Sequence, residues 1–177
     1  MKKKTKMIIA GTALVAFLFL FRNKIEMAVW DLISQKRIDK LHPSVRQKVL
    51  AFINKADKQG IKLRVTDGIR TFEEQNELYA QGRTKPGNIV TNAQGGESYH
   101  NYGLAVDVVE MVKGKPVYNN PNWEKIAAIG KSFGFVWGGD FKRIKDKPHF
   151  HLDFGYKIAD LQRKVINNEV VNGFVMV

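Results

Sequence analysis

The sequence contains no cysteine, which excludes both a disulfide framework and thiolate metal ligands. It has no internal repeat and no low-complexity linker. Histidine is scarce as well, with four residues in a chain of 177. Three of them, His100, His149 and His151, fall in two short segments that also contain acidic residues. This clustering indicates a metal site rather than scattered surface histidines.

The formal net charge is +12, a value also found in nucleic-acid-binding proteins. However, the first 24 residues contain six Lys/Arg and no acidic residue, so half of the excess belongs to the amino terminus. The rest of the chain has 23 basic and 17 acidic residues and no nucleic-acid-binding motif. We therefore expect no nucleic-acid partner. A modest positive excess suits an enzyme that acts on an anionic polymer, because it increases the rate of encounter.

The amino terminus predicts a membrane-targeting segment. Four lysines lie among the first six residues and precede fifteen uncharged, mostly apolar residues, Met7 to Phe21. This run is shorter than the roughly 20 residues of a spanning helix, but no small-x-small cleavage site follows it. We expect an uncleaved signal anchor over 1–24. The lysines would stay cytoplasmic, which places the remaining chain on the periplasmic or cell-wall side of the membrane.

Beyond the anchor, roughly 150 residues suffice for one domain with its own core. We expect a helical stalk over 25–40, the catalytic domain over 41–160 and a tail over 161–177. For the apolar end of this tail, 165–177, an added strand, a partner-docking segment and a frayed end all remain open.

Apolar periodicity predicts three helices in the domain, at 43–58, 71–81 and 122–133. It predicts four strands, at 61–66, 104–109, 135–137 and 149–154. Residues 83–97 are rich in Gly, Asn and Thr and predict a long loop. The pattern predicts an α+β fold, in which helices lie on one side of a small, mainly antiparallel sheet.

Two motifs carry the metal-binding side chains. In the first, His100 precedes a glycine-containing turn, and Asp107 lies in a short β-branched strand. In the second, Asp146 precedes His149 by three residues, and Pro148 favours the start of a strand at His149.

Together the motifs supply the groups of an open zinc site. Catalytic zinc takes three protein ligands and leaves one position vacant, and imidazole and carboxylate are among its usual ligands. His100, Asp107 and His149 form such a set, and Asp146 remains free to handle protons. Any one of these residues alone is typical of packing or capping. Their combination favours metal-assisted hydrolysis.

The two motifs, in this order, resemble the signature of zinc peptidases that cut bacterial cell-wall peptides. This family contains D-alanyl-D-alanine carboxypeptidases and dipeptidases, and L-alanyl-D-glutamate endopeptidases. The residues that carry the resemblance are Ser98, His100, Gly103, Ala105, Asp107, Asp146 and His149. Aspartate rather than glutamate in the second motif resembles the endopeptidase branch, which includes many phage endolysins. Stretches 66–71 and 137–141 also resemble that branch.

The resemblance implies a cofactor and its ligands. One zinc ion per chain would be held by His100, Asp107 and His149. Asp146 would act as the general base and then as the general acid, because a carboxylate beside the metal takes the proton of the attacking water and delivers it to the leaving amine.

The resemblance also implies two substrate-binding residues. Arg70 would lie near the scissile group and hold a carbonyl or carboxylate oxygen, with a catalytic role where an oxyanion develops. It follows an apolar alternation and precedes a helix with a capping-box pattern at Thr71 and Glu74, so we expect it at a strand-to-helix corner. Ser98 would line the substrate pocket.

His151 leaves an alternative open. In related metallopeptidases with a His-x-His pair, the second histidine binds the metal, which would make His151 the ligand. The Asp-x-x-His spacing favours His149 instead, because a site built on His151 would leave Asp146 too far along the strand.

The expected function is hydrolysis of an amide bond in peptidoglycan stem peptides, in first place an L-alanyl-D-glutamate bond. Two alternatives remain open: a D-Ala-D-Ala carboxypeptidase or dipeptidase with the same metal residues, and a catalytically silent peptidoglycan-binding module. The biological role is open between phage lysis, wall remodelling and local wall opening for an envelope machine, whose components would then be partners.

Overall fold

The computed structural model describes residues 32–177. The signal anchor predicted for 1–24 and the first part of the predicted stalk lie outside these residues. Among helices within 32–177, none is long and apolar enough to cross a membrane. Residues 32–39 are helical and contact the domain directly. The Ser34 hydroxyl accepts a hydrogen bond from Val65 N, and the Arg37 guanidinium donates to Val65 O.

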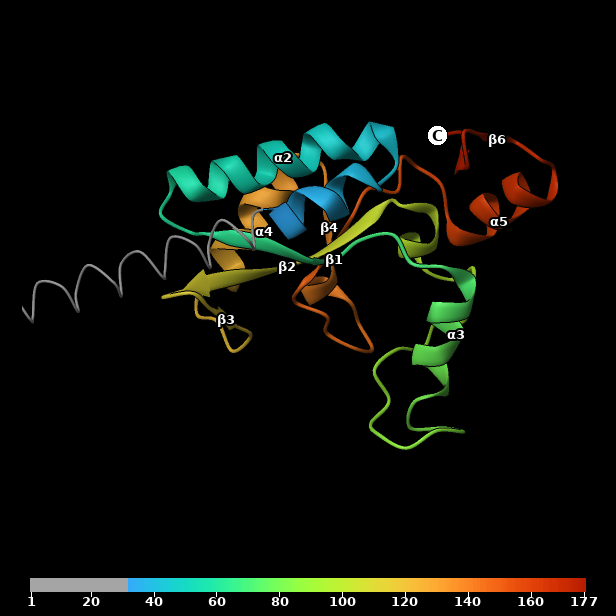
Figure 1. The fold of residues 1–177 in the computed structure, drawn as a ribbon, viewed down its shortest axis with the longest axis horizontal. Helices are drawn as coiled ribbons and strands as arrows, with labels where there is room; N and C mark the ends of the chain where they lie inside the picture. Colours follow the sequence, from blue (N-terminus) through green and yellow to red (C-terminus); the bar gives the residue numbers. More distant parts are fainter. Residues whose placement is uncertain (1–31) are drawn as a thin grey trace, which may run out of the picture.

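An antiparallel sheet forms the centre of the domain (Figure 1). Its strands follow the order β1 (Leu63–Asp67), β2 (Ala105–Val112), β5 (His149–His151) and β4 (Val136–Trp137). A further strand, β3 (Lys115–Val117), pairs with the end of β2. The turn between β2 and β3 contains only Lys113 and Gly114, both with positive φ, which is the geometry that hairpins favour.

Helices α2 (Pro43–Lys58) and α4 (Trp123–Ser132) pack together on one face of the sheet, α2 against β1 and α4 against β4. The core between them contains three phenylalanines. The Phe150 ring centroid lies 5.0 Å from that of Phe52 and 6.4 Å from that of Phe135. Gly130 on α4 permits this approach, because a Cβ there would lie 2.6 Å from the Phe150 ring. The predicted combination of helices with an antiparallel sheet is confirmed.

The register of β2 and β5 separates the core from the opposite face. Val106 pairs with Phe150, and both are fully buried on the helix side. The neighbouring pair, Asp107 and His149, projects to the other side, because side chains alternate along a strand. Helix α3 (Phe72–Ala80) and the loop that follows it lie on this other side in Figure 1, so the prediction that the helices lie on one side of the sheet holds for α2 and α4 but not for α3.

Strand β5 is shorter than predicted. The expectation was 149–154, but the strand ends at His151. Beyond it the chain turns, with Phe154 at a φ of 50° and Gly155 N donating to Asp153 Oδ1. A left-handed residue cannot continue a strand, and nothing in the apolar pattern distinguishes Phe154 from a strand residue.

The carboxy-terminal tail folds back onto the domain. Helix α5 (Ile158–Ile166) is followed by a hairpin of β6 (Val170–Val171) and β7 (Phe174–Val175). Asn172 and Gly173 form its turn, both with positive φ. The hairpin contacts the start of α2, where His42 Nε2 lies 2.9 Å from Val175 O. Of the alternatives left open for 165–177, the structure shows paired strands.

We expect Phe150→Ala to lower the free energy of unfolding by about 3–5 kcal/mol, because the ring is buried between two aromatic side chains and the sheet cannot collapse into the cavity. Denaturant unfolding followed by tryptophan fluorescence measures this. Val112→Ala, on an exposed position of the adjacent β2, is the control and should change stability by less than about 0.5 kcal/mol. Equal effects of the two substitutions would contradict the assigned core.

Candidate metal centre and active site

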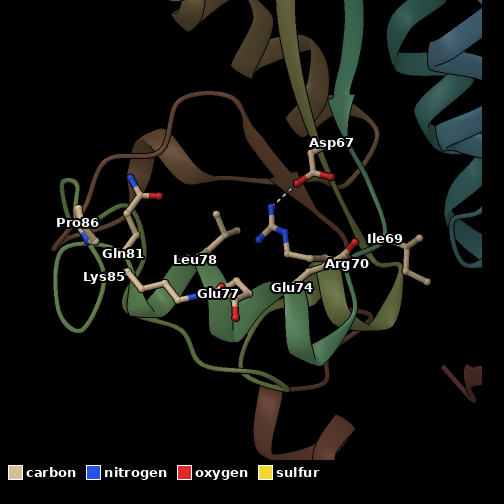
Figure 2. A pocket seen from close by; sticks show the side chains of 9 residues that line it. All are labelled: Asp67, Ile69, Arg70, Glu74, Glu77, Leu78, Gln81, Lys85 and Pro86. Atoms are coloured by element: carbon tan, nitrogen blue, oxygen red, sulfur yellow. Dashed lines mark hydrogen bonds and ion pairs between the residues drawn. The ribbon is translucent and has the colours of Figure 1, made fainter.

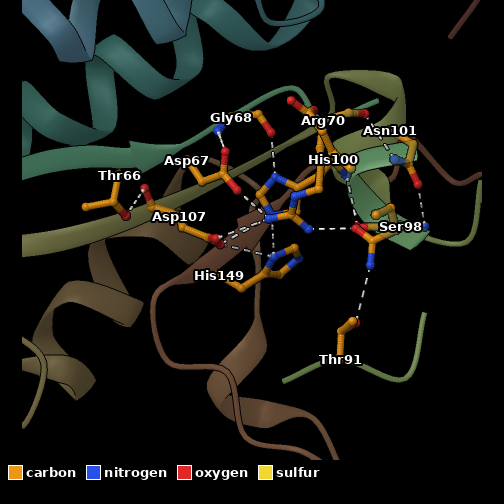
Figure 3. A network of polar contacts seen from close by, with 12 residues as sticks. Thr66, Asp67, Gly68, Arg70, Thr91, Ser98, His100, Asn101, Asp107 and His149 are labelled. Carbon is orange, nitrogen blue, oxygen red and sulfur yellow. Dashed lines mark hydrogen bonds and ion pairs between the residues drawn. The ribbon is translucent and has the colours of Figure 1, made fainter. Parts of the chain in front are cut away.

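Three adjacent strands place polar side chains in one row across the sheet. Asp67 on β1 pairs with Asp107 on β2, and Asp107 pairs with His149 on β5. Directly paired residues project to the same side, so these side chains converge. The fourth side chain, that of His100, comes from the short helix η1 (Tyr99–Tyr102), which immediately precedes β2 (Figure 3).

Gly103 explains the spacing between His100 and Asp107. It ends η1 in the left-handed conformation, with a φ of 67°, and a Cβ there would lie 2.8 Å from His42 N. The chain can therefore reverse within one residue and enter β2. Since η1 and β2 both flank this turn, the His100 and Asp107 side chains reach the same point.

The donor atoms of His100, Asp107 and His149 lie within 4.8 Å of one another. His100 Nε2 lies 3.3 Å from Asp107 Oδ1 and 3.1 Å from His149 Nδ1, and His149 Nδ1 lies 3.4 Å from the same Oδ1. A tetrahedral ion with bonds of about 2.0–2.1 Å separates its ligand atoms by about 3.4 Å. The three donors therefore fit a zinc ion almost without movement.

Asp107 Oδ1 is itself evidence for a cation. This oxygen is buried and has no hydrogen-bond partner within the described residues. A buried carboxylate oxygen without a partner is costly. A metal ion between Asp107 and the two imidazoles would remove this cost.

The other nitrogen of each imidazole also has a partner. His100 Nδ1 lies 2.6 Å from Gly68 O, so this nitrogen carries the proton and leaves the Nε2 lone pair free for a metal. His149 Nε2 lies 3.0 Å from His151 Nδ1. The His151 ring in turn stacks on Tyr99, with centroids 4.1 Å apart and planes 9° from parallel. The structure thus places His149 beside Asp107, and His151 behind His149.

The electrostatics follow from these contacts. Burial opposes ionisation of Asp107, but the two adjacent histidines outweigh burial and hold the pKa of its carboxyl well below its ordinary range. Burial alone would lower the pKa of His100. The Asp107 carboxylate has the opposite and larger effect, so the pKa of His100 lies above its ordinary value. Burial, together with His149 and His100, lowers the pKa of His151 to about 3. His151 is therefore neutral and can accept a hydrogen bond from His149.

Asp146 and His149 are joined by a tight turn, which explains their spacing. His149 N donates to Asp146 O at 3.2 Å, and Asp146 N donates to Gly138 O at 3.0 Å. The Trp137 indole fixes the turn by donating to Lys147 O at 2.7 Å. Gly138 has no room for a side chain, because a Cβ would lie 2.3 Å from Asp146 O.

Asp146 lies in a cleft of about 430 Å³ that also exposes the metal-binding cluster. Burial, followed by the nearby Asp107 carboxylate, raises the pKa of Asp146 above its ordinary value. A raised pKa favours a carboxyl that accepts a proton and later returns it. The predicted metal residues and the predicted proton-transfer residue therefore share one cleft.

Arg70 lies at the strand-to-helix corner, as its position before the Thr71 capping box predicts. Its guanidinium forms an ion pair with Asp67 (Figure 2) and donates to Gln75 Oε1 at 2.6 Å. The guanidinium also lies 4.0 Å from Asp107 Oδ2. Gln75 is 1% exposed and donates to Ala93 O at 2.8 Å, which ties α3 to the loop 83–97. Sequence reasoning missed Asp67 and Gln75 as residues that orient Arg70.

Ser98 lines the rim of the cleft. Its side-chain oxygen accepts a hydrogen bond from His100 N at 3.3 Å, and Asn101 completes the cap by accepting from Ser98 N. The hydroxyl therefore also holds η1, which presents His100.

The sequence matches the model of the VanY family, described as D-alanyl-D-alanine carboxypeptidase, over residues 38–170. The chain belongs to this family. It is 49% identical over 122 residues to the peptidoglycan L-alanyl-D-glutamate endopeptidase CwlK of Bacillus subtilis, an alignment that covers 63% of this chain and 73% of CwlK. Membership confirms the resemblance read from the two motifs and makes this VanY-family protein a peptidoglycan hydrolase.

Solved structures share the fold of this VanY-family chain. The crystal structure of the Serratia marcescens L-Ala D-Glu endopeptidase ChiX matches with a TM-score of 0.53 and 25% identity, over 68% of this chain and 86% of ChiX. A mutant of the vancomycin resistance D,D-pentapeptidase VanY in complex with Zn(II) matches with a TM-score of 0.50 and 18% identity, over 63% of this chain and 72% of that one.

We expect His151→Ala to weaken zinc binding about 10- to 100-fold, because His149 loses the acceptor that fixes the orientation of its ring. Competition with a chelator of known affinity measures the change. His151→Asn is the matched variant: its side-chain oxygen can still accept from His149 Nε2, so we expect it to retain most of the affinity. An affinity of the alanine variant within twofold of wild type would show that His149 needs no such support.

Proposed function

We propose that this protein is a zinc-dependent endopeptidase that hydrolyses the L-alanyl-D-glutamate bond of peptidoglycan stem peptides. The observation that carries the proposal is the buried Asp107 Oδ1 without a hydrogen-bond partner, placed between two imidazoles and beside the Asp146 carboxyl. The choice of bond is supported by the names of the relatives CwlK and ChiX. The choice of metal is supported by the donor set and by the Zn(II) complex of VanY.

Zinc, when held by His100, Asp107 and His149, supplies Lewis-acid polarisation of the scissile carbonyl and lowers the pKa of the attacking water. Asp146 accepts the proton of that water and then donates it to the leaving amine of the substrate. The turn that joins Asp146 to His149 keeps the carboxyl beside the metal ligands throughout.

Arg70 provides a fixed positive charge in the same cleft as Asp146. Its guanidinium is held by Asp67 and Gln75, so it needs no reorganisation when negative charge develops on the carbonyl oxygen. The substrate must bind between Arg70 and Asp146, because both line the cleft that exposes the metal donors.

We expect Asp146→Asn to lower kcat about 10²- to 10⁴-fold while the protein still binds zinc, because the amide keeps the shape of the carboxyl but cannot accept the proton. His149→Ala should lose both zinc and activity. Metal content and hydrolysis of purified sacculi, with and without chelator, test the two variants together. Retention of full activity by the asparagine variant would remove Asp146 from the mechanism.

The bond is identified by the new termini in the sacculus digest. Mass spectrometry should find L-alanine at the new carboxyl terminus and D-glutamate at the new amino terminus. Release of free D-alanine alone would instead assign the carboxypeptidase activity after which the family is named. Zinc and wall binding without any cleavage would favour a binding module.

We expect Arg70→Lys to lower kcat/KM about 10²-fold, because lysine keeps the charge but cannot contact Asp67, Gln75 and the developing oxyanion from one planar group. Steady-state kinetics on a stem-peptide substrate measure this. Arg163→Lys, on the exposed side of α5, is the matched control and should leave kcat/KM unchanged. Equal rates for the Arg70 variant and the control would contradict the role of Arg70.

We further propose that residues 1–24 anchor the protein in the cytoplasmic membrane, with the catalytic domain on the wall side. Support comes from the lysine-rich start and the apolar run Met7 to Phe21, together with a substrate that lies outside the membrane. Fractionation of cells that produce the full chain should recover it with membranes, and added protease should digest it in spheroplasts. Protection from protease in intact spheroplasts would reverse the orientation.

A further inference from the structure

Of the further hollows that adjoin the catalytic cleft, the one beside Arg37 and Lys40 shares only Arg70 with it. Two others share more residues with the cleft. One, of about 530 Å³, lies against α3 and shares Arg70 and Leu78 with the cleft (Figure 2). The other, of about 440 Å³, lies between loop 90–93 and residues 141–146, and it shares Asp146 and Phe141 with the cleft. We call the second one the basic hollow, because Lys142 and Arg143 are among the residues that line it.

The cations of the two hollows differ in what they already bind. In the hollow against α3, Arg70 forms an ion pair with Asp67, and Lys85 forms one with Glu77. Within 32–177, neither Lys142 nor Arg143 forms an ion pair. The basic hollow therefore places two cations without an ion pair among these residues directly beside Asp146.

The mechanism determines which part of the substrate lies at the basic hollow. Asp146 donates its proton to the leaving amine, so the residue that carries this amine must contact Asp146. Asp146 lines both the cleft and the basic hollow. From Asp146, the remaining groups of the leaving residue can reach Lys142 and Arg143.

Glutamate in the leaving position brings a negative charge to this place. It has two carboxyl groups, and the peptide can continue through only one of them, so the other remains a free carboxylate. We propose that Lys142 and Arg143 form a subsite for this free carboxylate of the leaving D-glutamate. The inference rests on the proposed function, and it assigns part of the specificity to charge recognition in the basic hollow.

The surroundings of the two cations suit this role. Both side chains are exposed, so they keep their mobility and hydration until the substrate arrives. The segment that carries them follows the short helix η2 (Gly138–Asp140) and leads into the turn fixed by Trp137. Two apolar residues, Val90 and Ile144, also line the hollow.

Two synthetic peptides test the subsite. Both contain an L-alanyl-D-glutamate bond and continue through the γ-carboxyl to lysine; one has the α-carboxylate free, and the other has it as a primary amide. We expect the wild-type protein to cleave the free acid with a kcat/KM about five- to tenfold higher, since each exposed ion pair contributes up to about fivefold. The double variant K142Q/R143Q should cleave both peptides at rates within about twofold of each other.

The matched control is K115Q/K125Q, which removes the same charge from exposed positions on β3 and α4. It should keep the preference for the free acid, and thermal melts should show that both double variants are folded. Equal kcat/KM of the wild type for the two peptides, or an undiminished preference in K142Q/R143Q, would overturn the subsite while leaving the endopeptidase intact. Cleavage of neither peptide by the wild type would instead contradict the proposed bond, and the subsite with it.

Discussion

The site depends on one buried carboxylate. Asp107 lies in the middle of the sheet, with His100 and His149 within 3.4 Å of its Oδ1 atom and Arg70 4.0 Å from its other oxygen. Each of these groups is held by further contacts: Gly68 O orients His100, His151 lies behind His149, and Asp67 fixes Arg70. The negative charge of Asp107 makes this arrangement of imidazoles and guanidinium electrostatically favourable, and it provides the charge that a divalent cation requires.

The fold provides this arrangement through strand register and a close approach of the backbone at Gly138. Pairing of β1, β2 and β5 aligns Asp67, Asp107 and His149, and a shift of β5 by one residue would turn His149 toward the core. Phe150 prevents such a shift, because it fills the core on the opposite face of β5. Gly138 then allows the Asp146 turn to approach, so that Asp146 and the candidate metal donor His149 come from one turn.

Rigid and adjustable parts of the site are separate. The metal donors lie on strands and on one capped helical turn, where packing restrains their positions. The residues that would contact the rest of the substrate lie on loops, 83–97 on one side and 141–147 on the other. This division agrees with a family whose members cut different bonds of cell-wall peptides, because loops can change specificity while the metal ligands stay in place. In this chain the loop beside Asp146 carries four basic residues, Lys142, Arg143, Lys145 and Lys147.

The sequence by itself determined what depends on local patterns: the amphipathic helix at 43–58, the Arg70 corner with its capping box, and the two motifs that contain the three metal donors and Asp146. It also contains a hairpin signal, Asn172-Gly173, at the turn between β6 and β7. Only the tertiary structure decided contacts between distant segments. Asp67 and Gln75 orient Arg70, His151 supports His149 rather than approaching Asp107, and Asp107 Oδ1 is left without a hydrogen bond. These contacts depend on strand register and on burial. Both result from packing of the whole chain, so the contacts cannot be predicted from any short stretch of the sequence.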